Sequence, residues 1–198
     1  VVLTEPRPDA PERFRFTFPR QQRSRFLCIA DFVRSREDAL ASGQVDVWPF
    51  QLVTMGQPIA DFANELFAAD AYRDYLEVHG IGVQLTEALA EYWHRRIRQE
   101  LAFAGGGTAA DEDPDEIAEY FKLAYRGARF AFGYGACPNL EDRIELVELL
   151  EPERIGVELS EEYFKKRRIP GLTVEKMDSL VGNAAPQCFN ILLAHSPQ

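Results

Sequence analysis

A long helical pattern between residues 59 and 103 constrains the fold of this chain more than any other feature. Apolar residues recur there at helical spacing over a length that suits two helices, and Gly80 and Gly82 mark a place where the first could end. We expect one helix over about Ile59–His79 and a second over about Val83–Phe103. The apolar stripe of the second helix predicts its core contacts: Leu85, Leu89, Tyr92, Trp93 and Leu101.

Shorter elements lie on both sides of this helical pattern. Apolar runs with β-branched and aromatic residues predict four strands: Arg25–Val33, Val45–Met55, Arg154–Leu159 and Phe189–Ala194. Pro49 removes a hydrogen-bond donor from the second of these, so we expect an edge position or a bulge there. Two further helices are expected, one from a cap at Asp113 to about Tyr125 and one over Asn139–Leu150. Strands, a long helical pair and then mixed elements indicate an α+β fold.

The composition narrows the possible functions. The chain is 46% hydrophobic, which predicts a packed core, and its formal net charge of −10 disfavours a nucleic-acid partner. No apolar run approaches the roughly eighteen residues of a membrane span, and no secretory signal is present, so a cytoplasmic location is the default expectation. Three widely spaced cysteines form neither a disulfide framework nor a zinc motif. A first residue other than Met suggests a fragment of a longer chain.

One face of the second long helix is polar. Glu87, Glu91, His94 and Arg98 follow one another at spacings of four, three and four residues. This pattern is typical of a solvated face with helix salt bridges, and His94 is then a surface or interface residue. Alternatively, one carboxylate lines a pocket. A metal is not expected, because the Glu-x-x-His half of a di-iron motif has no second copy.

The segment from Tyr125 to Pro138, YRGARFAFGYGACP, is the most unusual stretch of the sequence. Glycines alternate there with aromatic and small residues, just before the expected helix at Asn139. Glycine allows close backbone approach, and Arg129 offers a fork of donors that suits a carboxylate. The segment is either a tight structural loop or a binding site. Cys137 has no general base nearby in the sequence, so thiol catalysis is a weak interpretation.

Several long blocks of this chain resemble a known family. RFLCIADFV, DVWPFQLVTMG, LTEALAEYWHRRIRQEL, YRGARFAFGYGACPNLEDR and ELLEPERIGVELSEE look like successive blocks of the activation domain of cobalamin-dependent methionine synthases. The resemblance covers residues 14–163 and implies one domain with a twisted antiparallel sheet bordered by helices. Residues 1–13 are then a linker or arm, and residues 164–198 a divergent C-terminal tail.

The resemblance also implies a function. Domains of this family bind S-adenosylmethionine and serve the reductive remethylation of cob(II)alamin in a methyltransferase of methionine biosynthesis. Cobalamin is held by a neighbouring module of the same enzyme, and the electron comes from flavodoxin or a flavoprotein reductase. The isolated domain is not expected to be active alone. A non-catalytic docking module that has lost donor binding is the alternative, and a poorly folding truncated product is a third possibility.

The family's ligand residues map onto four positions of this sequence, and its corrin-facing tyrosine maps onto a fifth. By resemblance, Asp31 would accept from the donor's amino group, and Glu87 would add negative potential near the sulfonium. Arg129 would hold the methionine carboxylate, Ala131 would lend main-chain groups, and Tyr134 would face the corrin. The family's Lys-Tyr pair, which adds an aromatic contact to the donor, has no counterpart in residues 164–198.

Overall fold

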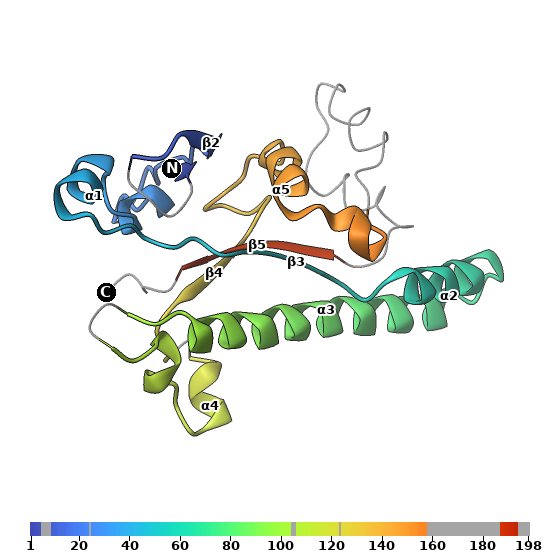
Figure 1. Cartoon of the computed structure of the whole chain (residues 1–198). Helices are drawn as coiled ribbons and strands as arrows, with labels where there is room; N and C mark the ends of the chain where they lie inside the picture. The colour runs from blue at the N-terminus through green and yellow to red at the C-terminus, as the bar shows by residue number, and fades with distance from the viewer. Residues whose placement is uncertain (5–8, 24, 104–105, 123, 158–186, 194–198) are drawn as a thin grey trace. The chain divides into compact units, whose positions relative to one another are not determined.

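The computed structural model describes residues 1–4, 9–23, 25–103, 106–122, 124–157 and 187–193 (Figure 1). Contacts divide the chain into two compact units. One comprises residues 1–51, 92–146 and the C-terminal residues from 189, and the other comprises residues 52–91 and 147–188. Helices and strands are mixed along the chain, which confirms the expected α+β class in its coarse form. The single domain and the boundaries at residues 14 and 163 stay predictions.

The two expected helices are present, but they divide at a different place. Helix α2 covers Gln57–Ala68 and helix α3 covers Tyr72–Glu100, which Figure 1 shows as one uninterrupted helix. The break falls at Asp70, whose φ of 56° is left-handed, and α3 continues through Gly80 and Gly82. An interior glycine costs a helix about 1 kcal/mol, which neighbouring turns can offset. The expected break at the two glycines was therefore wrong.

The buried face of α3 also differs from the expected stripe. Thr86, Ala90, His94 and Arg98 are buried at a spacing of four residues. By contrast, Tyr92 is 62% exposed, and Leu85 and Trp93 are each 47% exposed. The prediction that these three large apolar residues form the core contact was wrong, and so was the prediction of a solvated face at His94 and Arg98. Helix α3 buries a polar face that a hydrophobic pattern does not reveal.

The N-terminal region contains two short strands and two helical turns. Strand β1, Val2–Thr4, pairs antiparallel with β2, Glu12–Arg15. The strand expected at Arg25–Val33 was wrong, because Ile29–Phe32 form the 3₁₀ helix η1. Asp31 there accepts from the backbone N–H of Cys28, and such local bonds compete with strand pairing. Helix α1, Arg36–Ser42, begins at Ser35, whose hydroxyl accepts from the Asp38 N–H, and ends at Gly43.

Three strands form the second sheet. Strand β3, Phe50–Thr54, confirms the core of the expected run, and Pro49 lies just before it. Strand β5, Gln187–Leu193, confirms the last expected strand, and it lies between β3 and β4. Strand β4, Ala128–Ala131, was not expected, and it pairs antiparallel with β5 so that Arg129 is opposite Leu192 and Ala131 is opposite Asn190.

The segment between α3 and β4 is less helical than expected. It contains the 3₁₀ helix η2, Ala109–Glu112, and the four-residue helix α4, Ile117–Tyr120. Contrary to expectation, Asp113 is not the N-cap of a following helix, because its carboxylate pairs with Arg98; it is the C-cap of η2. Helix α5, Asp142–Leu150, confirms the last expected helix, with Leu146 fully buried and Ile144 37% exposed.

The remaining predictions for the C-terminal third have mixed outcomes. The strand expected at Arg154–Leu159 was wrong over the described residues, where Pro152–Ile155 form the 3₁₀ helix η3, followed by Gly156 at a φ of 75°. The predicted Leu159 and Ala194 lie outside the described residues, as does the tail at 164–186.

An aromatic cluster forms the core of the first unit. Phe16 and Phe132 are each 1% exposed, and their ring centroids lie 6.1 Å apart. Phe18, Trp48 and Phe50 complete the cluster with centroid separations between 5.6 and 6.3 Å. Burial of each such ring contributes on the order of 2–3 kcal/mol. Because Phe132 directly follows β4, this core anchors the end of that strand.

Within the described part of the chain, no helix combines the length and apolar character needed to cross a membrane.

Candidate functional site

Strand β4 carries two of the residues that the sequence singled out. Arg129 and Ala131 are two positions apart, so their side chains leave the same face of the strand. Both residues are partly buried. A partly buried guanidinium is a strong ligand for a carboxylate, because water competes less with its donors than it does at an exposed site.

A tight turn follows β4 and contains the expected glycines. The Tyr134 N–H donates to the Ala131 carbonyl at 3.4 Å, and the Cys137 N–H donates to the Tyr134 carbonyl at 2.9 Å. Gly133 has a φ of 101°, and its N–H donates to the Cys137 carbonyl at 2.9 Å. An added Cβ at Gly133 would lie 2.8 Å from the Leu140 side chain. Glycine is therefore required here for both conformation and space.

Two side chains attach this turn to its surroundings. The Cys137 thiol donates to the Ala131 carbonyl at 3.0 Å, and Arg143 Nη2 of α5 donates to the Phe132 carbonyl at 2.6 Å. Burial raises the pKa of the Cys137 thiol from its usual 9.0 to about 12, so the thiol stays protonated and keeps its donor at physiological pH. Cys137 is thus a structural donor here, in agreement with the weak case for thiol catalysis.

Tyr134 lies at the exposed tip of the turn. Its side chain is 73% exposed, whereas its neighbours Phe132 and Cys137 are buried. A phenol held outward on a rigid turn can make a stacking contact with a flat partner at little cost in conformational entropy. The corrin-facing role that the resemblance implies for Tyr134 stays a prediction.

The segment that leads into β4 is held by a buried charged cluster. Arg98 of α3 donates two hydrogen bonds to the carboxylate of Asp113, and the exposed fractions of the two side chains are 1% and 6%. The Arg98 guanidinium also lies over the Tyr125 ring at 4.7 Å and donates to the Arg126 carbonyl at 3.3 Å. The ring of His94 contacts Tyr125 edge-on at 5.8 Å. These contacts join α3 to the residues just before β4.

Asp31 has an intramolecular partner. Arg20 donates to both oxygens of its carboxylate at 2.5 Å, and both side chains are about half exposed. The Arg20 guanidinium holds the pKa of the Asp31 carboxyl below its usual range, with a smaller contribution from the Cys28 N–H. Any ligand amine at Asp31 would share the carboxylate with Arg20 or displace it.

Glu87 lies on an exposed part of α3 and belongs to the second unit. It is thus not placed relative to Asp31, Arg129 and Tyr134, which belong to the first unit. Of the five candidate residues, the structure brings together Arg129, Ala131 and Tyr134, on β4 and its following turn.

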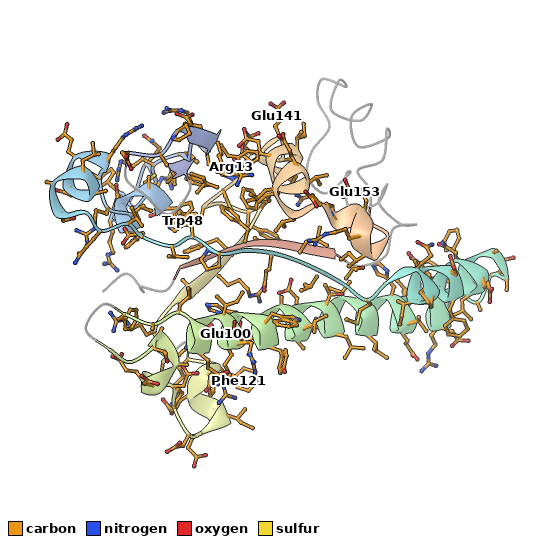
Figure 2. The ribbon with its side chains drawn as sticks, viewed as in Figure 1. Arg13, Trp48, Glu100, Phe121, Glu141 and Glu153 are labelled. Carbon is orange, nitrogen blue, oxygen red and sulfur yellow. The ribbon has the colours of Figure 1, made fainter. Side chains whose placement is uncertain are left out.

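The sequence did not indicate the partners of three arginines: Arg20 and Arg143 were not singled out, and Arg98 was expected on a solvated helix face. Arg20, Arg98 and Arg143 bind Asp31, Asp113 and the Phe132 carbonyl, respectively. Their partners lie 11 to 15 residues away, beyond the reach of helical spacing rules. Charged residues make up 27% of the chain, so charge alone did not distinguish the buried ones; Figure 2 shows side chains with nitrogen and oxygen atoms along many of its elements. Phe121, labelled in that view, is 86% exposed.

Comparison with known proteins identifies the lineage. The family described as "Vitamin B12 dependent methionine synthase, activation domain" matches residues 2–169. The chain belongs to this family. Methionine synthase of Mycobacterium tuberculosis is 78% identical over 162 residues, which are 82% of this chain and 14% of that protein. Methionine synthase of Mycobacterium leprae is 74% identical over 162 residues, which are 82% of this chain and 13% of that protein.

A solved structure supports the fold of this activation domain. It is described as the MetH reactivation domain bound to AdoHcy, and it matches with a TM-score of 0.66 at 24% identity, over 91% of this chain and 49% of that one. At this identity the likeness establishes the fold alone. The chain spans about a seventh of the length of the two mycobacterial relatives.

Proposed function

We propose that this activation domain binds S-adenosylmethionine and presents its methyl group for the reductive remethylation of cobalamin in a methionine synthase. The observation that carries the proposal is the build of β4 and its turn, where a partly buried Arg129, Ala131 and an exposed Tyr134 follow one another on a rigid backbone. The methionine synthase relatives, and the bound AdoHcy in the solved reactivation domain, support it. The full enzyme would be a methyltransferase of methionine biosynthesis.

Methyl transfer from S-adenosylmethionine requires this domain to bind and orient the donor, and little more. The methyl group of a sulfonium is already activated for transfer, so no general base is required. Cobalamin, bound by a neighbouring module, supplies the centre that takes the methyl group. The domain must hold the methionine moiety firmly and leave the methyl group accessible. A strand with a guanidinium on one face and an exposed aromatic side chain just beyond it suits both demands.

Arg129 is the residue that we assign to the ligand carboxylate. A guanidinium binds a carboxylate through two parallel hydrogen bonds, and partial burial strengthens both. Ala131 would contribute through its main chain. Its carbonyl already accepts from the Cys137 thiol and the Tyr134 N–H, which use both of its lone pairs. We therefore assign any ligand contact at Ala131 to its N–H.

Asp31 and Glu87 complete the proposed ligand set as sources of negative charge. Asp31 would receive the amino group of the donor, in exchange with or beside Arg20. Glu87, exposed on α3, would act through its potential near the sulfonium. The ammonium and sulfonium groups are both cationic, which suits a chain with a net charge of −10.

Tyr134 would face the corrin when the cobalamin-binding module docks. The partners that we propose are this module of the same enzyme and a flavodoxin or flavoprotein reductase that supplies the electron. The twisted antiparallel sheet of the family and the cytoplasmic location also belong to the proposal. The antiparallel pair β4–β5 is the part of that sheet whose register is established.

Calorimetric titration of the 198-residue chain with S-adenosylmethionine and with S-adenosylhomocysteine tests the proposal. We expect saturable binding of both. Arg129→Ala should weaken it at least tenfold, or by about 1.4 kcal/mol. Arg129→Lys should recover only part of the loss, because an ammonium cannot form the paired bonds. Arg15→Ala removes an exposed arginine that binds Glu12 and serves as the control of equal charge. Unchanged affinity in Arg129→Ala would reject the assignment.

One observation favours a second candidate, a docking module that no longer binds the donor. Both oxygens of Asp31 are already held by Arg20, so the expected amino-group acceptor is engaged within the chain. Arg20→Ala separates the two candidates. If Asp31 serves the donor, removal of its internal competitor should change the affinity for S-adenosylmethionine. Absence of any titration signal in the parent chain and in Arg20→Ala would support the docking module.

A further inference from the structure

We propose that Arg143 is a positioning residue that fixes the turn after β4 and so sets the placement of Ala131 and Tyr134. The proposal rests on the proposed function, since it concerns the same donor-binding strand. Arg143 lies in the first turn of α5, and its Nη2 donates to the Phe132 carbonyl at 2.6 Å. Phe132 lies between Ala131 and Gly133, at the point where the chain leaves the strand.

The space around Gly133 explains why Arg143 controls the turn. A Cβ at Gly133 would lie 2.8 Å from Leu140 Cδ2 and 3.2 Å from Arg143 Nη2. These two side chains therefore fill the volume beside the glycine, and the turn fits against them. Loss of the guanidinium would open this volume and remove the donor of the Phe132 carbonyl, a loss that a partly buried carbonyl does not tolerate well.

The other side of the turn is held independently. The Cys137 thiol donates to the Ala131 carbonyl at 3.0 Å, and Cys137 is 1% exposed. The Phe132 ring is anchored in the aromatic core against Phe16. With the ring and the thiol fixed, two bonds set the rotation of the Phe132–Gly133 peptide: its carbonyl accepts from Arg143 Nη2, and its N–H donates to the Cys137 carbonyl. That rotation decides where Tyr134 points.

The position of Tyr134 makes this control functional. Its side chain is 73% exposed and has few protein contacts to correct a rotated turn. A change of backbone geometry at Gly133 is thus passed directly to Tyr134, and through the Tyr134 N–H bond to the Ala131 carbonyl. Arg129 is two residues upstream of Ala131, so its placement depends on the same strand end.

Two measurements on the 198-residue chain test the inference. The first is amide hydrogen exchange by NMR at Gly133, Tyr134 and Cys137, which is independent of any ligand. Arg143→Ala should accelerate exchange at these amides at least tenfold relative to amides of α3. The second is calorimetric titration with S-adenosylhomocysteine, in which Arg143→Ala should lose at least tenfold in affinity and Arg143→Lys should stay within threefold of the parent chain.

Controls separate positioning from stability. Arg154→Ala removes an arginine that also donates to main-chain carbonyls, those of Leu150 and Glu151, and not to the Phe132 carbonyl. Leu146→Ala, at a fully buried position of α5, lowers the melting temperature without removing the guanidinium. Both should keep the affinity of the parent chain at a temperature where they are folded.

The outcomes are distinguishable. Unchanged exchange at the three amides in Arg143→Ala would overturn the inference, whether or not the affinity for S-adenosylhomocysteine changes. Equal affinity losses in Arg143→Ala and Leu146→Ala would overturn it too, because the effect would then follow stability. Accelerated exchange at the turn in a chain that binds no S-adenosylhomocysteine would leave the turn assignment standing and refute the proposed function instead.

Discussion

Asp113→Asn tests the buried charge pair that joins α3 to the segment before β4. The Arg98 and Asp113 side chains are 1% and 6% exposed, and Arg98 donates to both carboxylate oxygens. Loss of one partner leaves the other buried without a compensating charge, which costs about 3–5 kcal/mol in comparable pairs. The asparagine keeps one acceptor, so we expect a loss of about 3 kcal/mol in the free energy of unfolding.

The measurement is urea unfolding followed by circular dichroism at pH 7, with the slope m checked for each variant. Glu100→Gln is the matched control, because Arg96 and Glu100 form an ion pair on the same helix with both side chains more than half exposed. That variant should leave the free energy of unfolding unchanged within error. The double variant Arg98→Met/Asp113→Asn should lose less than the sum of its single variants, since it removes both buried charges together.

The reasoning would be refuted if Asp113→Asn cost no more than Glu100→Gln. Such a result would mean that water reaches the pair and that the cluster does not hold the chain before β4. Additive single losses in the double variant would also contradict it, because they would show that the two side chains do not act on each other.

Three further predictions concern the turn and the start of α5. At pH 8, Cys137 of the folded chain should react with iodoacetamide at least a thousandfold more slowly than Cys137 of the chain unfolded in urea. The reason is that its thiol is buried and its pKa is raised from 9.0 to about 12. Peptide mass spectrometry measures both rates, and equal rates would contradict the prediction. Gly133→Ala should lower the free energy of unfolding by about 1–3 kcal/mol, because a φ of 101° and a contact of 2.8 Å with the Leu140 side chain both oppose a Cβ. An unchanged midpoint of urea unfolding would contradict this prediction. Burial raises the pKa of Asp142, so the folded chain binds its proton more tightly, and this contribution to stability is lost as the pH rises from about 4 through the raised pKa. The stability of the parent chain relative to Asp142→Asn should therefore fall between pH 4 and pH 7, and a constant difference across that range would show that the pKa is not raised.

The sequence predicted those elements whose pattern is local. Helix α5, strand β3 and strand β5 were each expected within a few residues of where they lie, because apolar runs and cap residues are read over short distances. The two long helices were also expected, although Asp70 and not Gly80 or Gly82 separates them. Single glycines are weak stop signals inside a long helix, because each costs only about 1 kcal/mol.

The sequence could not predict features that depend on distant partners. The polar composition around His94 and Arg98 predicts a solvated face, yet both side chains are buried, because Tyr125 contacts His94 and Asp113 pairs with Arg98. Strand β4 was missed for a related reason, since its pairing partner β5 lies about 60 residues away. For the candidate site, the sequence singled out Arg129, Ala131 and Tyr134, whose roles stay predictions, but it did not indicate that Arg98 and Arg143 hold the residues on either side of them.

Arg98 and Arg143 add hydrogen bonds at both ends of the short strand β4. Strand β4 has only four residues, so its own ladder gives it few hydrogen bonds. Arg98 donates to the carbonyl of Arg126, before the strand, and Arg143 donates to the carbonyl of Phe132, just after it. Helices α3 and α5 thereby fix the two ends of the segment. A planar guanidinium loses less side-chain entropy for each hydrogen bond than a lysine ammonium does. A ligand that binds to Arg129 then meets a strand already ordered, so little of its binding energy is spent on arranging the site.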